Sequence, residues 1–324
     1  MAQRWTDSNY LARVRGWIHE RAEVTGPIEQ PHVQAWSTVL RVPTADGVLW
    51  CKAPGDPSEI GLTILLGELR PGWVPEVVAS NDEWMLLRDA GTRLRGLLEV
   101  DPDLTRWETV LAGCADLQLA TAPHAETRLD AGTPDTRPSV LPGRVAELLS
   151  EEPYLALDRP DGLTRADRDR LRARLPEIEA MCDELTAAGI PVTVQHDDLN
   201  DGNVFVDGDR YRIADWGDAT IAHPFHTLTV ALRATAWKLG LEPGGRDILR
   251  LRDAYLEPFE GYAPRDELVR LAEIGYRTGT LARALAWRDE LAAWPLDLRD
   301  EEDLTAVAYG LNLFLADGPI GTWE

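Results

Sequence analysis

The sequence predicts an α+β protein, with a small antiparallel β-sheet in its N-terminal part and a larger, mainly helical C-terminal part. Residues 32–52 contain three short β-rich runs, and Asp46-Gly47 forms the last turn between them. Beyond Gly91, apolar residues recur at helical spacing along almost the whole remaining chain. A chain of 324 residues is also long enough for two lobes. We therefore expect an N-terminal lobe over residues 1–91 and a C-terminal lobe over residues 92–324.

The N-terminal lobe is expected to begin with a helix. Asp7-Ser8-Asn9 offers an N-cap, and the apolar residues that follow have helical spacing. After the three strands, a short helix over residues 58–69 ends before Pro71-Gly72. Two further strands, around residues 77–78 and 84–87, then lead into the Gly-ended connector Arg88-Asp89-Ala90-Gly91.

The C-terminal lobe is expected to be built from helices. Their predicted ranges are 104–120, 144–149, 165–188, 227–239, 246–259, 265–294 and 302–316. The segment 130–142 is rich in Pro, Gly and Thr, and we interpret it as a loop between helices rather than a linker between domains.

A polar stretch over residues 192–218 interrupts this helical part. Two β-rich runs flank Asp207-Gly208-Asp209, which predicts a tight hairpin. The hairpin brings together two ends of one polar cluster, with Asp198 and Asn203 before it and Asp215 after it. Carboxylates and side-chain amides are hard oxygen ligands, suited to Mg²⁺ that is shared with substrate phosphates. The stretch therefore indicates phosphoryl transfer, although an Asp/Asn-rich surface loop is the simpler alternative.

Two motifs in this stretch resemble those of a known family. Residues 196–203 have the spacing H-x-D-x-x-x-x-N, which resembles the catalytic loop of the protein-kinase superfamily. Asp215-Trp216-Gly217 resembles the D-F-G metal motif, with Trp in place of Phe. Together they are similar to aminoglycoside phosphotransferases and related small-molecule kinases. The resemblance implies a two-lobed protein-kinase-like fold that uses ATP or GTP together with Mg²⁺.

The resemblance also implies roles for individual residues. Asp198 is expected to be the catalytic base, and Asn203 and Asp215 the metal ligands. Lys52, on the third strand, is expected to hold the nucleotide phosphates and to pair with Glu59, with Glu68 as the competing partner. Further nucleotide contacts are expected from the first strand corner and from the backbone of the connector, at Ser37, Thr38, Asp89 and Ala90. Ordinary hairpin residues remain the alternative for Ser37 and Thr38.

The catalytic loop contains two adjacent aspartates, because Asp197 stands where the related enzymes commonly have Gly. Only Asp198 keeps the five-residue step to Asn203, so we expect Asp198 to be the base. Asp197 is then left to solvent, to a backbone hydrogen bond or to the rim of an acceptor pocket. We expect His196 to anchor the loop by hydrogen bonds rather than to transfer a proton.

Composition narrows the classes of partner. The formal net charge of −22 argues against nucleic acid and against an anionic membrane surface. No run of 18 apolar residues exists, and the first ten residues lack the apolar core of a signal peptide. The three cysteines are widely spaced without a metal-ligand pattern, which indicates reduced thiols. We therefore expect a cytoplasmic protein. We also expect a monomer.

The acceptor is expected to be a small molecule with a hydroxyl group. The acidic balance and the acidic runs at 289–290 and 297–303 favour a molecule that carries an amine, and the resemblance implies an aminoglycoside-like antibiotic. A solvated, charged helix face and a capping segment are the simpler alternative for any single residue of these runs. Such an enzyme would confer antibiotic resistance. The alternatives are a metabolic kinase of a sugar, amino alcohol or nucleoside, and an inactive kinase-like scaffold. A protein acceptor is disfavoured, because the H-R-D and A-P-E segments of protein kinases are absent from the sequence.

Overall fold

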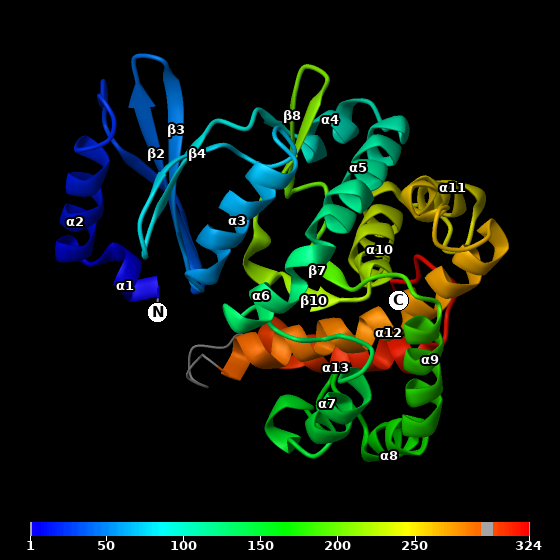
Figure 1. The fold of residues 1–324 in the computed structure, drawn as a ribbon. Coiled ribbons are helices and arrows are strands. Elements are labelled where there is room, and N and C mark those ends of the chain that lie inside the picture. Colours follow the sequence, from blue (N-terminus) through cyan, green and yellow to red (C-terminus); the bar gives the residue numbers. More distant parts are fainter. Residues whose placement is uncertain (1, 293–300, 324) are drawn as a thin grey trace. The chain divides into compact units, whose positions relative to one another are not determined.

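The computed structural model describes residues 2–292 and 301–323. The chain forms two compact units (Figure 1). The first comprises the residues up to Glu99 together with Gly202–Gly217, and the second comprises Val100–Asp201 and the residues from Asp218 onward. The α+β fold class is confirmed, since an antiparallel sheet comes first and a mainly helical part follows. The predicted division into an N-terminal lobe of residues 1–91 and a C-terminal lobe of residues 92–324 stays a prediction.

A five-stranded antiparallel sheet organises the first unit. Its strand order is β1-β2-β3-β5-β4, with the bounds β1 (Glu29–Val33), β2 (Ser37–Thr44), β3 (Gly47–Pro54), β4 (Val77–Ser80) and β5 (Met85–Arg88). The predicted turn at Asp46-Gly47 joins β2 to β3, and Gly47 has the positive φ of 121° that only glycine adopts without strain. The first strand lies three residues earlier than predicted, because residues 34–36 form the turn into β2.

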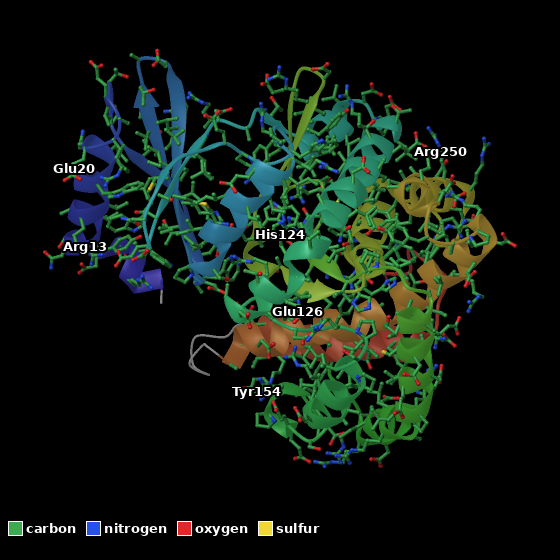
Figure 2. The ribbon with its side chains drawn as sticks, viewed as in Figure 1. Arg13, Glu20, His124, Glu126, Tyr154 and Arg250 are labelled. Atoms are coloured by element: carbon green, nitrogen blue, oxygen red, sulfur yellow. The ribbon has the colours of Figure 1, made fainter. Side chains whose placement is uncertain are left out.

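Helices cover this sheet on both faces (Figure 1). The predicted N-terminal helix is present as α2 (Ser8–His19), after the short α1 (Ala2–Thr6), and Asp7 caps it by accepting hydrogen bonds from two backbone amides. Its inner side packs Val14, Trp17 and Ile18 against sheet residues such as Leu40 and Leu86. Charged residues lie on its outer side, where Figure 2 labels Arg13 and Glu20. On the other face lies α3 (Ser58–Leu69), which carries Glu59 in its first turn.

A smaller three-stranded sheet in the same unit contains the predicted hairpin. Strand β6 (Thr92–Arg93) pairs with β8 (Val204–Asp207), which pairs with β9 (Arg210–Ile213). Gly208 adopts a φ of +65° in the hairpin turn, as the Asp-Gly pattern predicts. Gly91 approaches this hairpin closely, since a Cβ there would lie 2.3 Å from the carbonyl oxygen of Val206. A residue larger than glycine at position 91 would therefore push β6 away from β8.

The second unit is mainly helical, with one two-stranded antiparallel sheet. The strands are β7 (Thr193–Gln195) and β10 (Thr220–Ala222). The main helices are α5 (Thr105–Thr121), α6 (Ala125–Asp130), α7 (Leu141–Leu148), α8 (Arg165–Ala173), α9 (Leu175–Ala187), α10 (Thr227–Leu239), α11 (Arg246–Leu256), α12 (Arg265–Ala292) and α13 (Glu301–Ala316). Single 3₁₀ turns of this unit occur at η1 (Ala122–His124), η2 (Glu152–Tyr154), η4 (Pro224–His226) and η5 (Glu257–Phe259). The short helix α4 (Leu94–Val100) lies at the end of the first segment of the first unit, and the 3₁₀ turn η3 (Trp216–Asp218) lies where the chain passes from the first unit to the second.

Two predicted helices are wrong in detail. The predicted single helix over residues 165–188 is two helices, because Pro176 lacks the amide that would continue the hydrogen bonding of α8 and instead occupies the first turn of α9. The predicted helix over 246–259 ends at Leu256 and tightens into η5, in which Pro258 is an early residue. The final residues of the predicted helix 265–294 lie outside the described part of the chain.

The long helix α12 lies at the centre of the second unit and packs against α7, α9, α10 and α13 (Figure 1). Small residues allow a close approach, since a Cβ at Gly279 would lie 2.1 Å from the hydroxyl oxygen of Thr229, and one at Gly275 would lie 2.5 Å from the Cβ of Phe225. These contacts hold η4 and α10 against α12. Across the described residues, we find no helix that is both long and apolar enough to span a membrane.

Candidate active site

Lys52 is a buried lysine held between two carboxylates of the first unit. It lies on β3, where only 8% of the residue is exposed. Its Nζ donates a hydrogen bond of 2.5 Å to Oε1 of Glu59, and a second hydrogen bond to Oδ1 of Asp215. Burial by itself lowers the pKa of this ammonium group, but Asp215 and Glu59 outweigh burial and raise the pKa above its ordinary value. Lys52 is therefore a fixed positive charge.

Glu59 is the carboxylate that pairs with Lys52 from helix α3. Only 3% of Glu59 is exposed, whereas Glu68, the competing candidate, is exposed near the other end of the same helix. Gly217 lies next to this pair, since a Cβ there would be 3.2 Å from Oε2 of Glu59. The spacing Lys52–Glu59 in the sequence thus corresponds to a real ion pair, and its role in nucleotide binding stays a prediction.

Asp215 and Asn203 lie at the same end of the β8–β9 hairpin. The amide of Ala214 donates to the carbonyl oxygen of Asn203 over 2.9 Å, which continues the strand pairing by one residue. Asp215 then turns out of the hairpin with a φ of +68°, a conformation that is rare and costly for a residue with a Cβ. The buried Trp216 indole anchors this turn by donating to the carbonyl oxygen of Ile213 over 3.0 Å.

This pair of residues fits a Mg²⁺ site that is completed by substrate. An amide and a carboxylate are hard oxygen donors, and Mg²⁺ in phosphoryl-transfer sites is held by one or two such residues plus phosphate oxygens. Within the described ranges, no group of three or more His, Cys, Asp or Glu side chains has the arrangement of a complete metal site. The fit of Asn203 and Asp215 to Mg²⁺ rests on the chemistry of these two donors, and metal binding here stays a prediction.

Hydrogen bonds to Asp89 and Ala90 fix the connector after β5. Asp89 accepts hydrogen bonds from the Trp50 indole over 2.8 Å and from the amide of Gly91 over 2.9 Å. The carbonyl oxygen of Ala90 accepts from Arg212 over 3.1 Å. The Asp89 side chain thus orders the turn, and contacts between this backbone and adenine stay a prediction.

Ser37 and Thr38 are both buried at the start of β2. The Thr38 hydroxyl donates to the carbonyl oxygen of His32 over 2.8 Å and accepts from the Gln30 amide over 2.8 Å. This hydroxyl therefore stabilises the β1–β2 hairpin. Contacts of either residue with phosphate stay a prediction.

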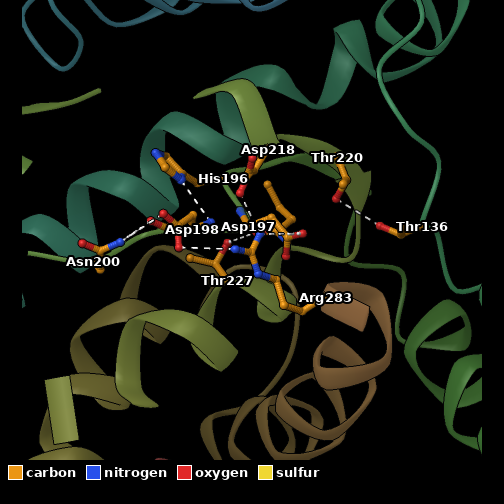
Figure 3. A network of polar contacts seen from close by, with 10 residues as sticks. Thr136, His196, Asp197, Asp198, Asn200, Asp218, Thr220, Thr227 and Arg283 are labelled. Carbon is orange, nitrogen blue, oxygen red and sulfur yellow. Dashed lines mark hydrogen bonds and ion pairs between the residues drawn. The ribbon is translucent and has the colours of Figure 1, made fainter. Parts of the chain in front are cut away.

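The predicted catalytic loop, residues 196–203, begins directly after β7, and its residues 196–201 belong to the second unit. His196 is fully buried, and its Nδ1 accepts a hydrogen bond of 3.2 Å from the amide of Asp198, so the ring anchors the loop (Figure 3). The Asp198 side chain is 35% exposed. Its Oδ2 accepts from the Asn200 side chain over 3.1 Å, and its Oδ1 lies 3.6 Å from Nη2 of Arg283. The expected base is thus accessible and held at both oxygens.

Asp197 does not face solvent, which excludes one of the three placements expected for it. Only 3% of the residue is exposed, and it adopts a φ of +62°, a conformation that glycine adopts at less cost. Its Oδ1 accepts from the Gln195 side chain over 2.6 Å, and its own amide donates to Oε1 of Gln195 over 2.7 Å. Burial raises the pKa of this carboxyl to about 6, although the charge of Arg283 acts in the opposite direction.

Arg283 is a residue of this loop environment that the sequence did not indicate. It lies on α12, and its Nη1 donates to Oδ2 of Asp218 over 2.8 Å and lies 3.7 Å from Oδ2 of Asp197. Its guanidinium carbon is 5.2 Å from the centre of the Trp287 ring. Burial lowers the pKa of Arg283, but the surrounding carboxylates, led by Asp218, outweigh burial and raise it. No local pattern in the sequence distinguishes Arg283 from the other arginines of α12.

A cavity of about 410 Å³ lies elsewhere in the second unit and is lined by Pro134, Asp135, Val140, Arg144 and Asp289. Arg144 donates to Oδ2 of Asp289 and to the carbonyl oxygen of Asp135, each over 2.6 Å. Asp289 belongs to the first predicted acidic run, and here its charge is already offset by an arginine. The second run, 297–303, begins outside the described residues.

Solved structures of small-molecule kinases share this fold. An ethanolamine kinase of Plasmodium vivax matches with a TM-score of 0.63 and 13% identity, covering 96% of this chain and 89% of that chain. A macrolide 2'-phosphotransferase type I matches with a TM-score of 0.56 and 16% identity, covering 94% and 98%. An amicoumacin kinase in complex with AMP-PNP and Ca²⁺ matches with a TM-score of 0.61 and 12% identity, covering 98% and 96%.

The fold and these likenesses define the class as a protein-kinase-like fold of the kind found in small-molecule kinases. A sequence model described as "Phosphotransferase enzyme family" (APH) matches residues 86–268, which is more than half of the chain. The chain therefore belongs to the APH phosphotransferase family, and it is a small-molecule kinase. A comparison with curated protein sequences found no match.

Proposed function

We propose that this phosphotransferase transfers the γ-phosphate of ATP or GTP, with Mg²⁺, to a hydroxyl group of a small molecule that carries an amine. The observation that carries the proposal is the buried Lys52 held by both Glu59 and Asp215. A buried cation paired with two carboxylates is costly to build, because each desolvated charge must be offset by its partners. A lysine fixed in this way is suited to an ionic substrate such as a nucleotide phosphate.

Each candidate residue has a role in this proposal. Lys52 binds the nucleotide phosphates, and Glu59 keeps its ammonium group in place. Asn203 and Asp215 would hold Mg²⁺, and the bound ion would neutralise the charge that develops on the phosphates. Asp198 accepts the hydrogen bond of the acceptor hydroxyl and takes up its proton as the hydroxyl oxygen attacks the γ-phosphorus. The bond between the γ-phosphorus and the β,γ-bridging oxygen breaks, and the nucleoside diphosphate leaves.

The acceptor is the least constrained part of the proposal. The net charge of −22 favours a cationic molecule, because an acidic protein attracts cations. The similar solved structures include kinases named for ethanolamine and choline and others named for antibiotics. An antibiotic-modifying enzyme is our first choice and a metabolic kinase of an amino alcohol the second. The buried, free thiols of Cys51, Cys114 and Cys182 support a cytoplasmic location.

The decisive experiment measures nucleotide consumption with a panel of hydroxyl compounds that are cationic, neutral or anionic. ATP and GTP are each supplied with Mg²⁺, and with excess chelator as the control. We expect turnover with at least one cationic acceptor, and we expect its KM to rise with salt because ion pairs are screened. If a neutral or anionic compound had a higher kcat/KM than every cationic compound, the proposal that the acceptor carries an amine would be refuted. Nucleotide binding without turnover on any acceptor would instead support the scaffold alternative.

A further inference from the structure

Three carboxylates from two segments converge on one guanidinium group in the second unit (Figure 3). Asp197 and Asp198 belong to the catalytic loop, and Asp218 precedes β10. Arg283 is 2.8 Å from Asp218, 3.6 Å from Asp198 and 3.7 Å from Asp197. Only the contact with Asp218 is short enough to be a hydrogen bond, so Asp218 fixes the guanidinium and the two loop carboxylates lie in its field.

The guanidinium has little freedom to move. Its side chain is only 12% exposed, and the ring of Trp287, one turn further along α12, lies 5.2 Å away in the arrangement of a cation–π contact. The helix itself is 28 residues long and is packed at the centre of its unit. A charge on a rigid element is suited to orienting a second group, because the geometry is set before any ligand binds.

The Asp198 carboxylate is held on both sides. Arg283 faces its Oδ1, and the Asn200 side chain donates to its Oδ2 over 3.1 Å. The two contacts therefore restrict the rotation of the carboxylate.

We propose that Arg283 is a positioning residue that orients Asp198 for the reaction, an inference that rests on the proposed function. Arg283 acts through Asp198 and makes no contact of its own with the nucleotide in this proposal. The same guanidinium offsets the charge of Asp197, which is buried at a loop position that related enzymes commonly fill with glycine. Arg283 and Asp197 are thus coupled, and the two effects of Arg283 can be separated by mutation.

The main test compares Arg283→Gln and Arg283→Lys with Arg277→Gln as a matched control. Arg277 lies on the same helix and, like Arg283, pairs with carboxylates and lies over an aromatic ring. Its partners are Glu177, Asp317 and Phe314, which do not belong to the predicted catalytic loop. We expect Arg283→Gln to lower kcat about 10- to 100-fold with an unchanged Kd for nucleotide, because misplacing a catalytic group costs rate rather than binding. Lysine should restore part of the loss, and Arg277→Gln should keep the wild-type kcat.

The double variant Arg283→Gln/Asp197→Gly separates orientation from charge balance. If Arg283 orients Asp198, the double variant regains thermal stability, because no buried carboxylate is left uncompensated, but it keeps the low kcat of Arg283→Gln. Recovery of the wild-type kcat in the double variant would overturn the proposal, since Arg283 would then only neutralise Asp197.

A crystal structure of Arg283→Gln gives a readout that does not depend on turnover. We expect the Asp198 carboxylate to change its rotamer or to become disordered, while β7 keeps its place. An unchanged, ordered Asp198 would overturn the positioning role. If the wild-type protein consumed no nucleotide with any acceptor, the proposed function would fail, and this structural comparison would still decide whether Arg283 orients Asp198.

Discussion

Replacing Asp197 with asparagine should stabilise the protein, and the gain should depend on pH. Burial raises the pKa of this carboxyl from its ordinary value of 3.8 to about 6. Since the folded-state pKa is raised, the folded protein is favoured while the group is protonated, and stability is lost as the pH rises through about 6. The difference between the two values corresponds to about 3 kcal/mol at 1.36 kcal/mol per pKa unit. Asparagine has the same shape and carries no charge, so it escapes this cost.

The magnitude can be followed along the pH scale. Linkage gives a gain for Asp197→Asn of about 3 kcal/mol at pH 7, about half of that at pH 5 and about 0.5 kcal/mol at pH 4, where the carboxyl of the folded protein is protonated. Urea denaturation of both proteins, followed by tryptophan fluorescence at these pH values, measures the difference. Asp116→Asn is the matched control, because Asp116 is exposed on α5 and its replacement should change stability by less than about 0.5 kcal/mol. A difference for Asp197→Asn that does not vary with pH would refute the reasoning.

Three further results are expected. Asp198→Asn should lower kcat by about 10²- to 10⁴-fold with nucleotide binding retained, whereas Asp197→Asn should stay within about tenfold in steady-state assays; the reverse pattern would shift the loop alignment by one residue. Lys52→Met should weaken nucleotide binding in calorimetry and cost about 3–5 kcal/mol of stability by leaving Glu59 buried without its cation, and adding Glu59→Gln should restore stability but not binding. Asp215→Ala should abolish turnover, as excess chelator should in the wild type, with an unchanged circular dichroism spectrum; activity in either case would contradict a metal role.

The parts of the site that sequence could predict depend on local geometry. The Asp-Gly turn defines the β8–β9 hairpin, and the hairpin brings Asn203 next to Ala214 and Asp215 whatever the rest of the chain does. Lys52 and Glu59 are seven residues apart at a strand-to-helix transition, so their pairing also follows from short-range structure. Both features can be predicted from sequence because they depend mainly on contacts between residues that are close in the chain.

Arg283 and the burial of Asp197 could not be predicted in this way. Arg283 lies more than eighty residues after Asp198, and their contact depends on how α12 packs against η4 through Gly275 and Gly279. Helix α12 contains several arginines, and nothing in the sequence around them indicates which one reaches the predicted catalytic loop. In the packed structure, Asp197 has a positive φ that glycine adopts more readily, and the buried Arg283 offsets the charge of its carboxylate.

The discontinuity of the first compact unit has a consequence for the order of events during synthesis. Residues 100–201 are translated after Glu99 and before the hairpin that completes the unit. At about 5–20 residues per second, the ribosome needs on the order of 5–20 s for this interval. Throughout it, strand β6 lacks its partner β8, and Lys52 has Glu59 but not Asp215. A nascent chain arrested before residue 202 should therefore carry an incomplete, protease-sensitive first unit, and the unit should become resistant only once residue 217 has left the exit tunnel.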